Sequence, residues 1–192
     1  MDPINIFVAI NLALSFVSNL NITKESLTGK FGNFKEKPKS YLQSLPLWIS
    51  STIILFTILA IFQVGTFEYN NKFLSIRLSG LICYIVFTWL QIGSFKNLGK
   101  FHSTEVVIKI EHQLVTDKYY RWIRHPQYLF QILIDLGAAF ATLSYLILSL
   151  AILQIYFLIK RAQLEESLLE KHFGKKFLEY KSKTGFLIPF LK

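Results

Sequence analysis

Apolar residues of this chain gather in long uninterrupted stretches, separated by polar segments. The stretches cover Ile4–Leu20, Leu45–Phe67, Phe73–Phe95 and Leu129–Ile159. A helix needs about 20 apolar residues to cross a membrane, so each of the first three predicts one crossing. The fourth is too long for one crossing, and Thr142-Leu143-Ser144-Tyr145 offers a turn near its middle. It therefore predicts two helices joined as a hairpin.

The pattern as a whole predicts an all-α integral membrane protein with five transmembrane helices. Residues 1–95 are expected to form a three-helix membrane scaffold with a basic cytosolic loop over 21–43. Residues 96–127 form a second polar loop, in which Glu105–Ile110 is short and β-prone. The C-terminal helical hairpin is expected over 128–160.

The tail, residues 161–192, carries a different helical pattern. Leu164, Leu168 and Leu169 fall on one stripe, with His172 or Phe173 one turn further on, and Gly174 is a plausible break. This spacing predicts an amphipathic tail helix that lies on the cytosolic membrane face.

Composition supports a membrane protein and sets its orientation. The chain is 52% hydrophobic and only 17% charged, against about a quarter charged in soluble domains. Lys and Arg concentrate in the two polar loops and in the tail. Basic residues favour the cytosolic side, so the N-terminus is expected outside and the C-terminus in the cytosol. Five crossings satisfy both ends, because an odd number is required.

The formal net charge of +9 has a simple interpretation as attraction to anionic membrane lipids. Nucleic-acid binding is not expected, because the basic residues are spread over three segments without a recognisable reading module. The single cysteine, Cys83, excludes an intramolecular disulfide and a thiolate zinc cluster, and no metal is expected. The first three apolar stretches carry no charge at mid-depth, which argues against an ion pathway.

Polar motifs stand at both ends of the predicted hairpin. Arg124-His125-Pro126-Gln127-Tyr128 precedes it, and Arg161 with Glu165-Glu166 follows it. A hairpin would bring both groups to one membrane face. Arg161 and Glu165 are four residues apart and can pair on one helix face. An arginine at membrane depth can also hold a carboxylate or phosphate in a bidentate fork. Taken singly, Tyr128 could be an interfacial anchor, and Arg161 could extend to lipid headgroups.

In their order along the chain, these motifs resemble the integral-membrane methyltransferases. The matching elements are His112-Gln113-Leu114-Val115, Tyr120, Arg124-His125-Pro126-Gln127-Tyr128, Arg161-x-x-x-Glu165-Glu166 and Phe173-Gly174 with Tyr180. The family comprises the isoprenylcysteine carboxyl methyltransferases and the related phospholipid N-methyltransferases, and the resemblance covers residues 98–190. It implies a methyltransferase core over 96–192, with an S-adenosylmethionine site that is not a Rossmann fold and is roofed by the tail.

The resemblance also implies roles for individual residues. Arg161 is expected to hold the acceptor carboxylate, and Glu165 to bind the amino-acid end of the cofactor; both are expected to be catalytic. Phe130 stands where the family commonly has glycine, which adds bulk near the cofactor or the acceptor entrance. The expected cofactor contacts are Glu105, His112, Gln113, Leu114, Val115, Tyr120, His125, Pro126, Gln127, Tyr128 and Glu165.

The predicted function is therefore methyl transfer from S-adenosylmethionine, with S-adenosylhomocysteine as product. The preferred acceptor is the carboxylate of an isoprenylcysteine-like or other lipophilic molecule that enters from the bilayer at the cytosolic face. One alternative is an N-methyltransferase for a phospholipid amine of the phosphatidylethanolamine type. A second is a non-catalytic, lipid-binding membrane module.

Overall fold

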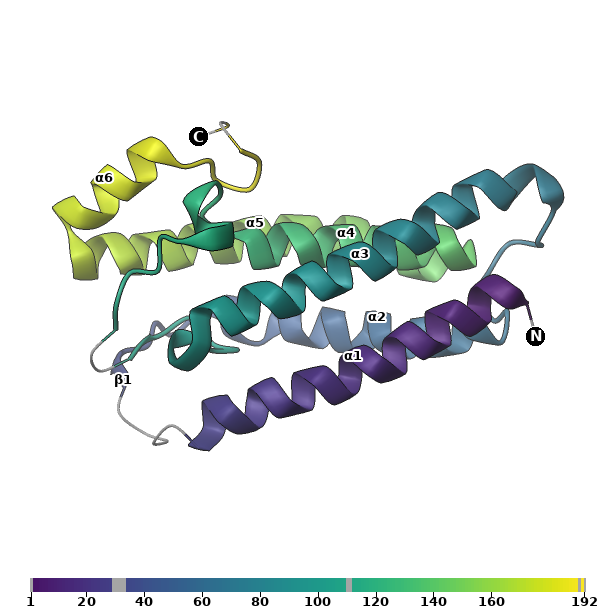
Figure 1. Cartoon of the computed structure of the whole chain (residues 1–192), viewed down its shortest axis with the longest axis horizontal. Helices are drawn as coiled ribbons and strands as arrows, with labels where there is room; N and C mark the ends of the chain where they lie inside the picture. The colour runs from purple at the N-terminus through teal and green to yellow at the C-terminus, as the bar shows by residue number, and fades with distance from the viewer. Residues whose placement is uncertain (1, 29–33, 110–111, 190, 192) are drawn as a thin grey trace.

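The computed structural model describes residues 2–28, 34–109, 112–189 and 191, and its long helices run side by side along one axis (Figure 1). The N-terminus lies at one end of the bundle and the C-terminus at the other (Figure 1). The helices are α1 (Pro3–Thr28), α2 (Leu45–Ile61), α3 (Leu74–Leu98), α4 (Pro126–Thr142), α5 (Tyr145–Phe173) and α6 (Lys175–Lys183).

Four helical segments of the described chain are long and apolar enough to cross a membrane: Pro3–Leu20, Tyr41–Ile61, Asn71–Leu98 and Tyr145–Phe173. Large apolar side chains point outward from these segments; Phe16 and Ile82, for example, are both 63% exposed. Such an apolar surface is suited to contact with lipid. The helical backbone is suited to it as well, because its polar groups form their hydrogen bonds within the helix. The protein is a multi-pass integral membrane protein.

α4 and α5 form the predicted hairpin, with its turn at the predicted place. α4 ends at Thr142, and Leu143 adopts a left-handed conformation with φ 50°. The Ser144 side chain then caps α5 by accepting a hydrogen bond from the Ile147 N–H at 3.3 Å. α4 has 17 residues, about 26 Å at 1.5 Å per residue. That is slightly less than the hydrocarbon core, so its role as the fourth of five crossings stays a prediction.

α3 and α4 approach each other closely through two glycines. A Cβ atom at Gly80 would lie 2.5 Å from the Ala141 nitrogen, and one at Gly137 would lie 2.6 Å from the Tyr84 nitrogen. Small residues allow backbones of membrane helices to come this near, and the gain in van der Waals contact holds the pair together.

The loop predicted over residues 21–43 departs from its prediction. α1 continues to Thr28, well past the end of its apolar stretch, so residues 21–28 are helical. The helix can continue because its backbone hydrogen bonds do not depend on lipid contact. Residues 29–33 of the predicted loop lie outside the described residues.

The fold is also not purely helical. A short strand, β1 (Phe34–Glu36), pairs in antiparallel fashion with β2 (Ile108–Lys109). β2 lies in the segment predicted to be β-prone. The pairing joins the two polar loops, so the predicted scaffold and the predicted core share this ribbon.

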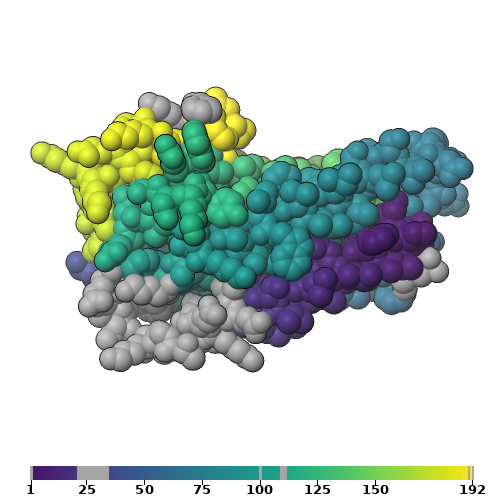
Figure 2. Space-filling model, in the orientation of Figure 1, coloured from purple at the N-terminus to yellow at the C-terminus, as the bar shows by residue number. Residues whose placement is uncertain are grey.

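The tail folds back over the end of α5. Gly174 has φ 53°, a conformation that glycine adopts without strain, and it separates α5 from α6 as predicted. α6 buries Phe177, which is 1% exposed. Figure 2 shows the tail packed against residues 112–125 at one end of the molecule.

Candidate functional site

The two open ends of the hairpin, the start of α4 and the C-terminal part of α5, meet at the end of the bundle that carries the tail. The Tyr128 hydroxyl, in the first turn of α4, donates a hydrogen bond to Glu165 Oε2 on α5 at 2.9 Å. The expectation that the hairpin brings these sequence-distant groups together is therefore confirmed.

The local structure before α4 explains why Tyr128 points this way. Pro126 begins α4, where its missing N–H costs nothing. The two residues before it pair with the tail: the Arg124 N–H donates to the Gly185 carbonyl at 2.9 Å, and the His125 N–H donates to the Phe186 carbonyl at 3.2 Å. The start of α4 is thus held between the membrane bundle and the tail.

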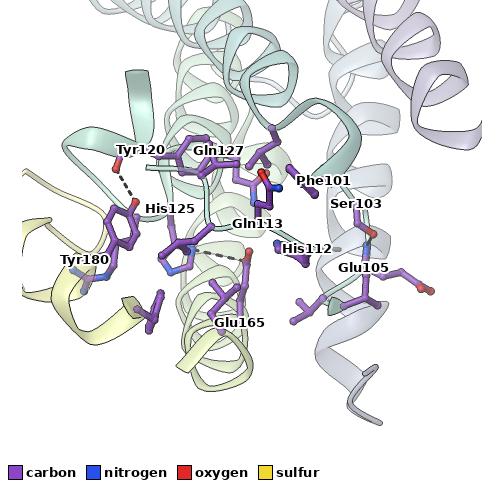
Figure 3. Close-up of a pocket in the computed structure, with 18 residues that line it drawn as sticks. Phe101, Ser103, Glu105, His112, Gln113, Tyr120, His125, Gln127, Glu165 and Tyr180 are labelled. Carbon is purple, nitrogen blue, oxygen red and sulfur yellow. Dashed lines mark hydrogen bonds and ion pairs between the residues drawn. The ribbon is translucent and has the colours of Figure 1, made fainter. Parts of the chain in front are cut away.

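An open cavity lies beside these residues. Its empty space, including the part open to solvent, is about 660 Å³. Its walls come from the loop after α3, the start of α4, the C-terminal part of α5, and α6 (Figure 3). The predicted cofactor residues that line it are Glu105, His112, Gln113, Leu114, Val115, Tyr120, His125, Gln127 and Glu165.

Three predicted site residues are not part of this lining. Pro126 is buried at the start of α4. Tyr128 touches the site through the hydroxyl that reaches Glu165. Arg161 lies behind Tyr128, donating from Nε to the tyrosine hydroxyl at 3.2 Å. Tyr128 therefore connects Arg161 to Glu165, and no direct ion pair joins those two residues in the described part of the chain.

Backbone carbonyl groups surround the rest of the Arg161 guanidinium. Nη1 donates to the carbonyls of Leu42 and Gln43 at 3.0 and 3.1 Å, and Nη2 donates to the carbonyl of Thr104. The residue is only 4% exposed. Arg161 on α5 thus contacts the start of α4 and both polar loops.

A second buried cluster centres on Glu166, which is not among the predicted site residues. Arg124 Nε lies 2.5 Å from Glu166 Oε1, and Lys181 Nζ lies 3.0 Å from Oε2. His125 stands between the two glutamates, with Nε2 3.3 Å from Glu166 and Nδ1 3.8 Å from Glu165. Arg124 also donates to the backbone carbonyls of Lys181 and Thr184. These contacts hold the tail in place against α5, beside the cavity.

Aromatic side chains complete the walls. The Tyr180 hydroxyl donates to the Tyr120 carbonyl at 2.6 Å (Figure 3). Burial raises the pKa of both tyrosines well above the usual value, so both remain neutral at physiological pH. The His112 ring lies 5.3 Å from the Phe101 ring and 5.8 Å from the Phe173 ring, measured between centroids.

Several lining residues escaped the sequence prediction: Leu98, Phe101, Ser103, Val106, Val107, Arg124, Leu169, Phe177 and Tyr180. Two of them had a signal, because Arg124 and Tyr180 belong to the motifs quoted above. The others are ordinary apolar, aromatic or hydroxyl residues whose spacing is not distinctive.

The chemistry of the lining favours a ligand that is both cationic and aromatic. The Glu165 carboxylate can pair with an ammonium group, and tyrosine and phenylalanine rings attract cations and stack on planar rings. The buried basic groups Arg124, which lines the cavity, and Arg161, which does not, both have partners within the protein.

Comparison with known proteins places this geometry in a family. A family model described as phospholipid methyltransferase matches residues 76–176, more than half of the chain. Protein-S-isoprenylcysteine O-methyltransferase of Saccharomyces cerevisiae is 24% identical over 198 aligned residues, which cover 96% of this chain and 81% of the yeast protein. The Tribolium castaneum protein of the same name is 31% identical over 92 residues, covering 47% of this chain and 33% of the insect protein.

A solved structure agrees on the fold. It is described as the eukaryotic intramembrane Ras methyltransferase ICMT, an isoprenylcysteine carboxyl methyltransferase, and superposes with a TM-score of 0.64. The match covers 100% of this chain and 69% of that one at 19% sequence identity. Together these matches define the protein as a multi-pass membrane methyltransferase. The chain belongs to the phospholipid methyltransferase family.

Proposed function

We propose that the cavity binds S-adenosylmethionine and that the protein methylates the carboxylate of a lipophilic acceptor at the cytosolic membrane face. The observation that carries the proposal is the meeting of Tyr128 and Glu165 at 2.9 Å beside a cavity that nine predicted cofactor residues line. The name of the yeast relative, which matches nearly the whole chain, supports an isoprenylcysteine-like acceptor.

The residues present suit this cofactor. Its sulfonium would supply an activated methyl group. Glu165 would pair with its ammonium group, and Tyr120, Tyr180 and Phe101 offer rings for its planar and cationic parts. The polar backbone of His112–Val115 also lies along the wall of this cavity. Phe177 and Tyr180, on the tail, would exclude water from the reacting atoms.

A carboxylate acceptor needs no general base, because it attacks in its ionised form and its charge is neutralised in the reaction. The task of the protein is then placement and removal of water. Arg161 remains our proposed partner for the acceptor carboxylate. Four of its N–H groups already donate to Tyr128, Leu42, Gln43 and Thr104. Among the contacts of the described residues, one N–H of Nη2 is not used. In this conformation Arg161 would therefore donate a single hydrogen bond to the acceptor carboxylate rather than a bidentate pair.

The proposed topology has five crossings, with the N-terminus outside and the C-terminus in the cytosol. Support comes from the placement of basic residues in the sequence and from the two termini at opposite ends of the bundle (Figure 1). The cofactor would then arrive from the cytosol, and the lipid part of the acceptor would enter sideways from the bilayer.

N-methylation of a phospholipid amine is the second candidate, favoured by the description of the family model. An amine must lose a proton, so this reaction needs a base near the acceptor. Glu165 and His125 are the groups positioned to serve.

The two candidates separate in one experiment. The purified protein in lipid nanodiscs is incubated with methyl-labelled S-adenosylmethionine and either a prenylcysteine or a phosphatidylethanolamine. We expect the label in a base-labile methyl ester of the prenylcysteine. Label in the phospholipid headgroup would support the second candidate, and cofactor binding without transfer to either acceptor would contradict both.

A further inference from the structure

Residues 103–107 form one wall of the cavity, but no helix or strand contains them. Ser103, Glu105, Val106 and Val107 all line the cavity. Val106 is nevertheless buried, in an apolar cluster that also contains Leu168 of α5 and Ile108. A buried backbone outside regular structure must find its hydrogen-bond partners elsewhere.

The partner of this wall is the side chain of Gln43, at the end of the short 3-10 helix Tyr41–Gln43. The Val106 N–H donates to Gln43 Oε1 at 2.9 Å, and Gln43 Nε2 donates to the Val106 carbonyl at 2.9 Å. The amide therefore pairs with both backbone groups of one residue, as a neighbouring strand would. Gln43 Nε2 also donates to the Pro38 carbonyl at 3.2 Å, which fixes the orientation of the amide.

Other contacts hold the same two loops in register. Arg161 donates to the carbonyls of Gln43 and Thr104, one residue from each loop. The β1–β2 pairing follows directly after the wall in the sequence, with Glu36 opposite Ile108. Among these contacts, only those of the Gln43 amide involve both the N–H and the carbonyl group of a lining residue, Val106.

Gln43 lies in the part of the chain that sequence patterns assign to the membrane scaffold, and outside the match to the family model at 76–176. Nothing in its local sequence distinguishes it from any loop glutamine. Its importance follows from the position of Val106 alone.

We propose that Gln43 is a positioning residue for the cofactor: it holds the 103–107 wall in the conformation that binds S-adenosylmethionine. This inference rests on the proposed function. Gln43 acts through Val106 and its neighbours rather than by touching the ligand, so its loss should weaken cofactor binding more than it slows methyl transfer at saturating cofactor.

The test replaces Gln43 by leucine, which keeps the approximate size and removes both polar groups. Titration calorimetry with S-adenosylhomocysteine should give a Kd about tenfold higher than wild type, the effect of losing one or two hydrogen bonds. KM for S-adenosylmethionine should rise in parallel, with kcat changed less than about twofold. Hydrogen exchange should accelerate in residues 103–107 and stay unchanged in α3.

Two variants complete the design. Gln43→Glu keeps the acceptor for the Val106 N–H but removes the donor to the Val106 carbonyl, so its Kd should lie between those of wild type and Gln43→Leu. It serves as the primary variant if the leucine protein does not fold. Gln163→Leu changes an exposed glutamine on α5 and should leave Kd and KM unchanged.

The outcomes are distinct. If wild type binds S-adenosylhomocysteine and both Gln43 variants bind it equally well, the inference is wrong while the proposed function stands. A fall in kcat with unchanged KM also overturns it, because a positioning role for the cofactor requires the opposite. If wild type itself does not bind, the proposed function fails, and this inference with it.

Discussion

Tyr128 and Glu165 are 37 positions apart in the chain, yet the tyrosine hydroxyl donates to the glutamate carboxylate at 2.9 Å. The same hydroxyl accepts a hydrogen bond from Arg161 at 3.2 Å. One phenol group thus orients a carboxylate and a guanidinium whose spacing in the sequence would also allow them to pair directly. The carboxylate faces the cavity, while the guanidinium stays buried among backbone carbonyls.

Replacing Tyr128 by phenylalanine should therefore reduce activity without unfolding the protein. Glu165 loses a donor and Arg161 loses an acceptor, and hydrogen bonds to charged groups contribute about 1.5–3 kcal/mol each. We expect kcat/KM to fall about 10- to 100-fold. Steady-state kinetics with labelled cofactor measures this. Tyr145→Phe, at the exposed start of α5, is the control and should be silent. Full activity of Tyr128→Phe would contradict the bridging role.

Replacing Arg124 by glutamine should loosen the tail. The substitution removes the buried contact to Glu166 and the two hydrogen bonds to tail carbonyls. Breaking a buried ion pair from one side costs about 3–5 kcal/mol, and Lys181 beside Glu166 should keep the loss near the lower value. Limited proteolysis near Gly174 should become faster. Arg121→Gln, on the exposed surface nearby, should digest at the wild-type rate. If Arg124→Gln is digested no faster than Arg121→Gln, other contacts hold the tail.

Adding a methyl group to Gly80 should destabilise the α3–α4 pair. The new Cβ would lie 2.5 Å from the Ala141 nitrogen, so the helices must move apart. Overpacking of this kind costs about 1–3 kcal/mol. Thermal unfolding in detergent should show a lower Tm for Gly80→Ala, while Ser79→Ala, one position away on the exposed face, should keep the wild-type Tm. An unchanged Tm for Gly80→Ala would mean that the helices adjust without loss.

The contact between Asp2 and Arg77, at the opposite end of the bundle, should make stability depend on pH. Asp2 Oδ1 lies 2.6 Å from Arg77 Nη2, and this hydrogen bond lowers the pKa of Asp2 below its usual 3.8. A lowered pKa in the folded state adds stability that is fully present above pH 3.8 and is lost as the pH falls through the folded value.

Asp2→Asn should consequently have a lower Tm than wild type at pH 7, and the difference should shrink below about pH 3.8. Thermal unfolding of both proteins across this pH range checks the sign. Glu68→Gln, in the segment between α2 and α3, is the matched control and should track wild type. A difference that stays constant to the lowest pH would show that Asp2 does not act through its charge.

Much of this architecture can be predicted from the amino-acid sequence. The apolar stretches predict the long helices, because the length and composition of a segment are enough to show that it can cross a membrane as a helix. The turn at Leu143–Ser144 and the break at Gly174 are visible as interruptions of these patterns. The motifs at the two ends of the hairpin place His125, Gln127 and Glu165 in the cavity lining, since a hairpin returns its two ends to one face.

The tertiary structure decided what those motifs contact. Arg161 lies four residues before Glu165, a spacing that allows the two to pair, but Tyr128 and three backbone carbonyls receive its hydrogen bonds instead. Gln43 belongs to a loop without any pattern, yet its amide completes the backbone pairing of Val106. Local composition cannot reveal such contacts, because backbone carbonyl and N–H groups are the same at every position. Only the path of the chain in space determines which of them lie within reach of a side chain.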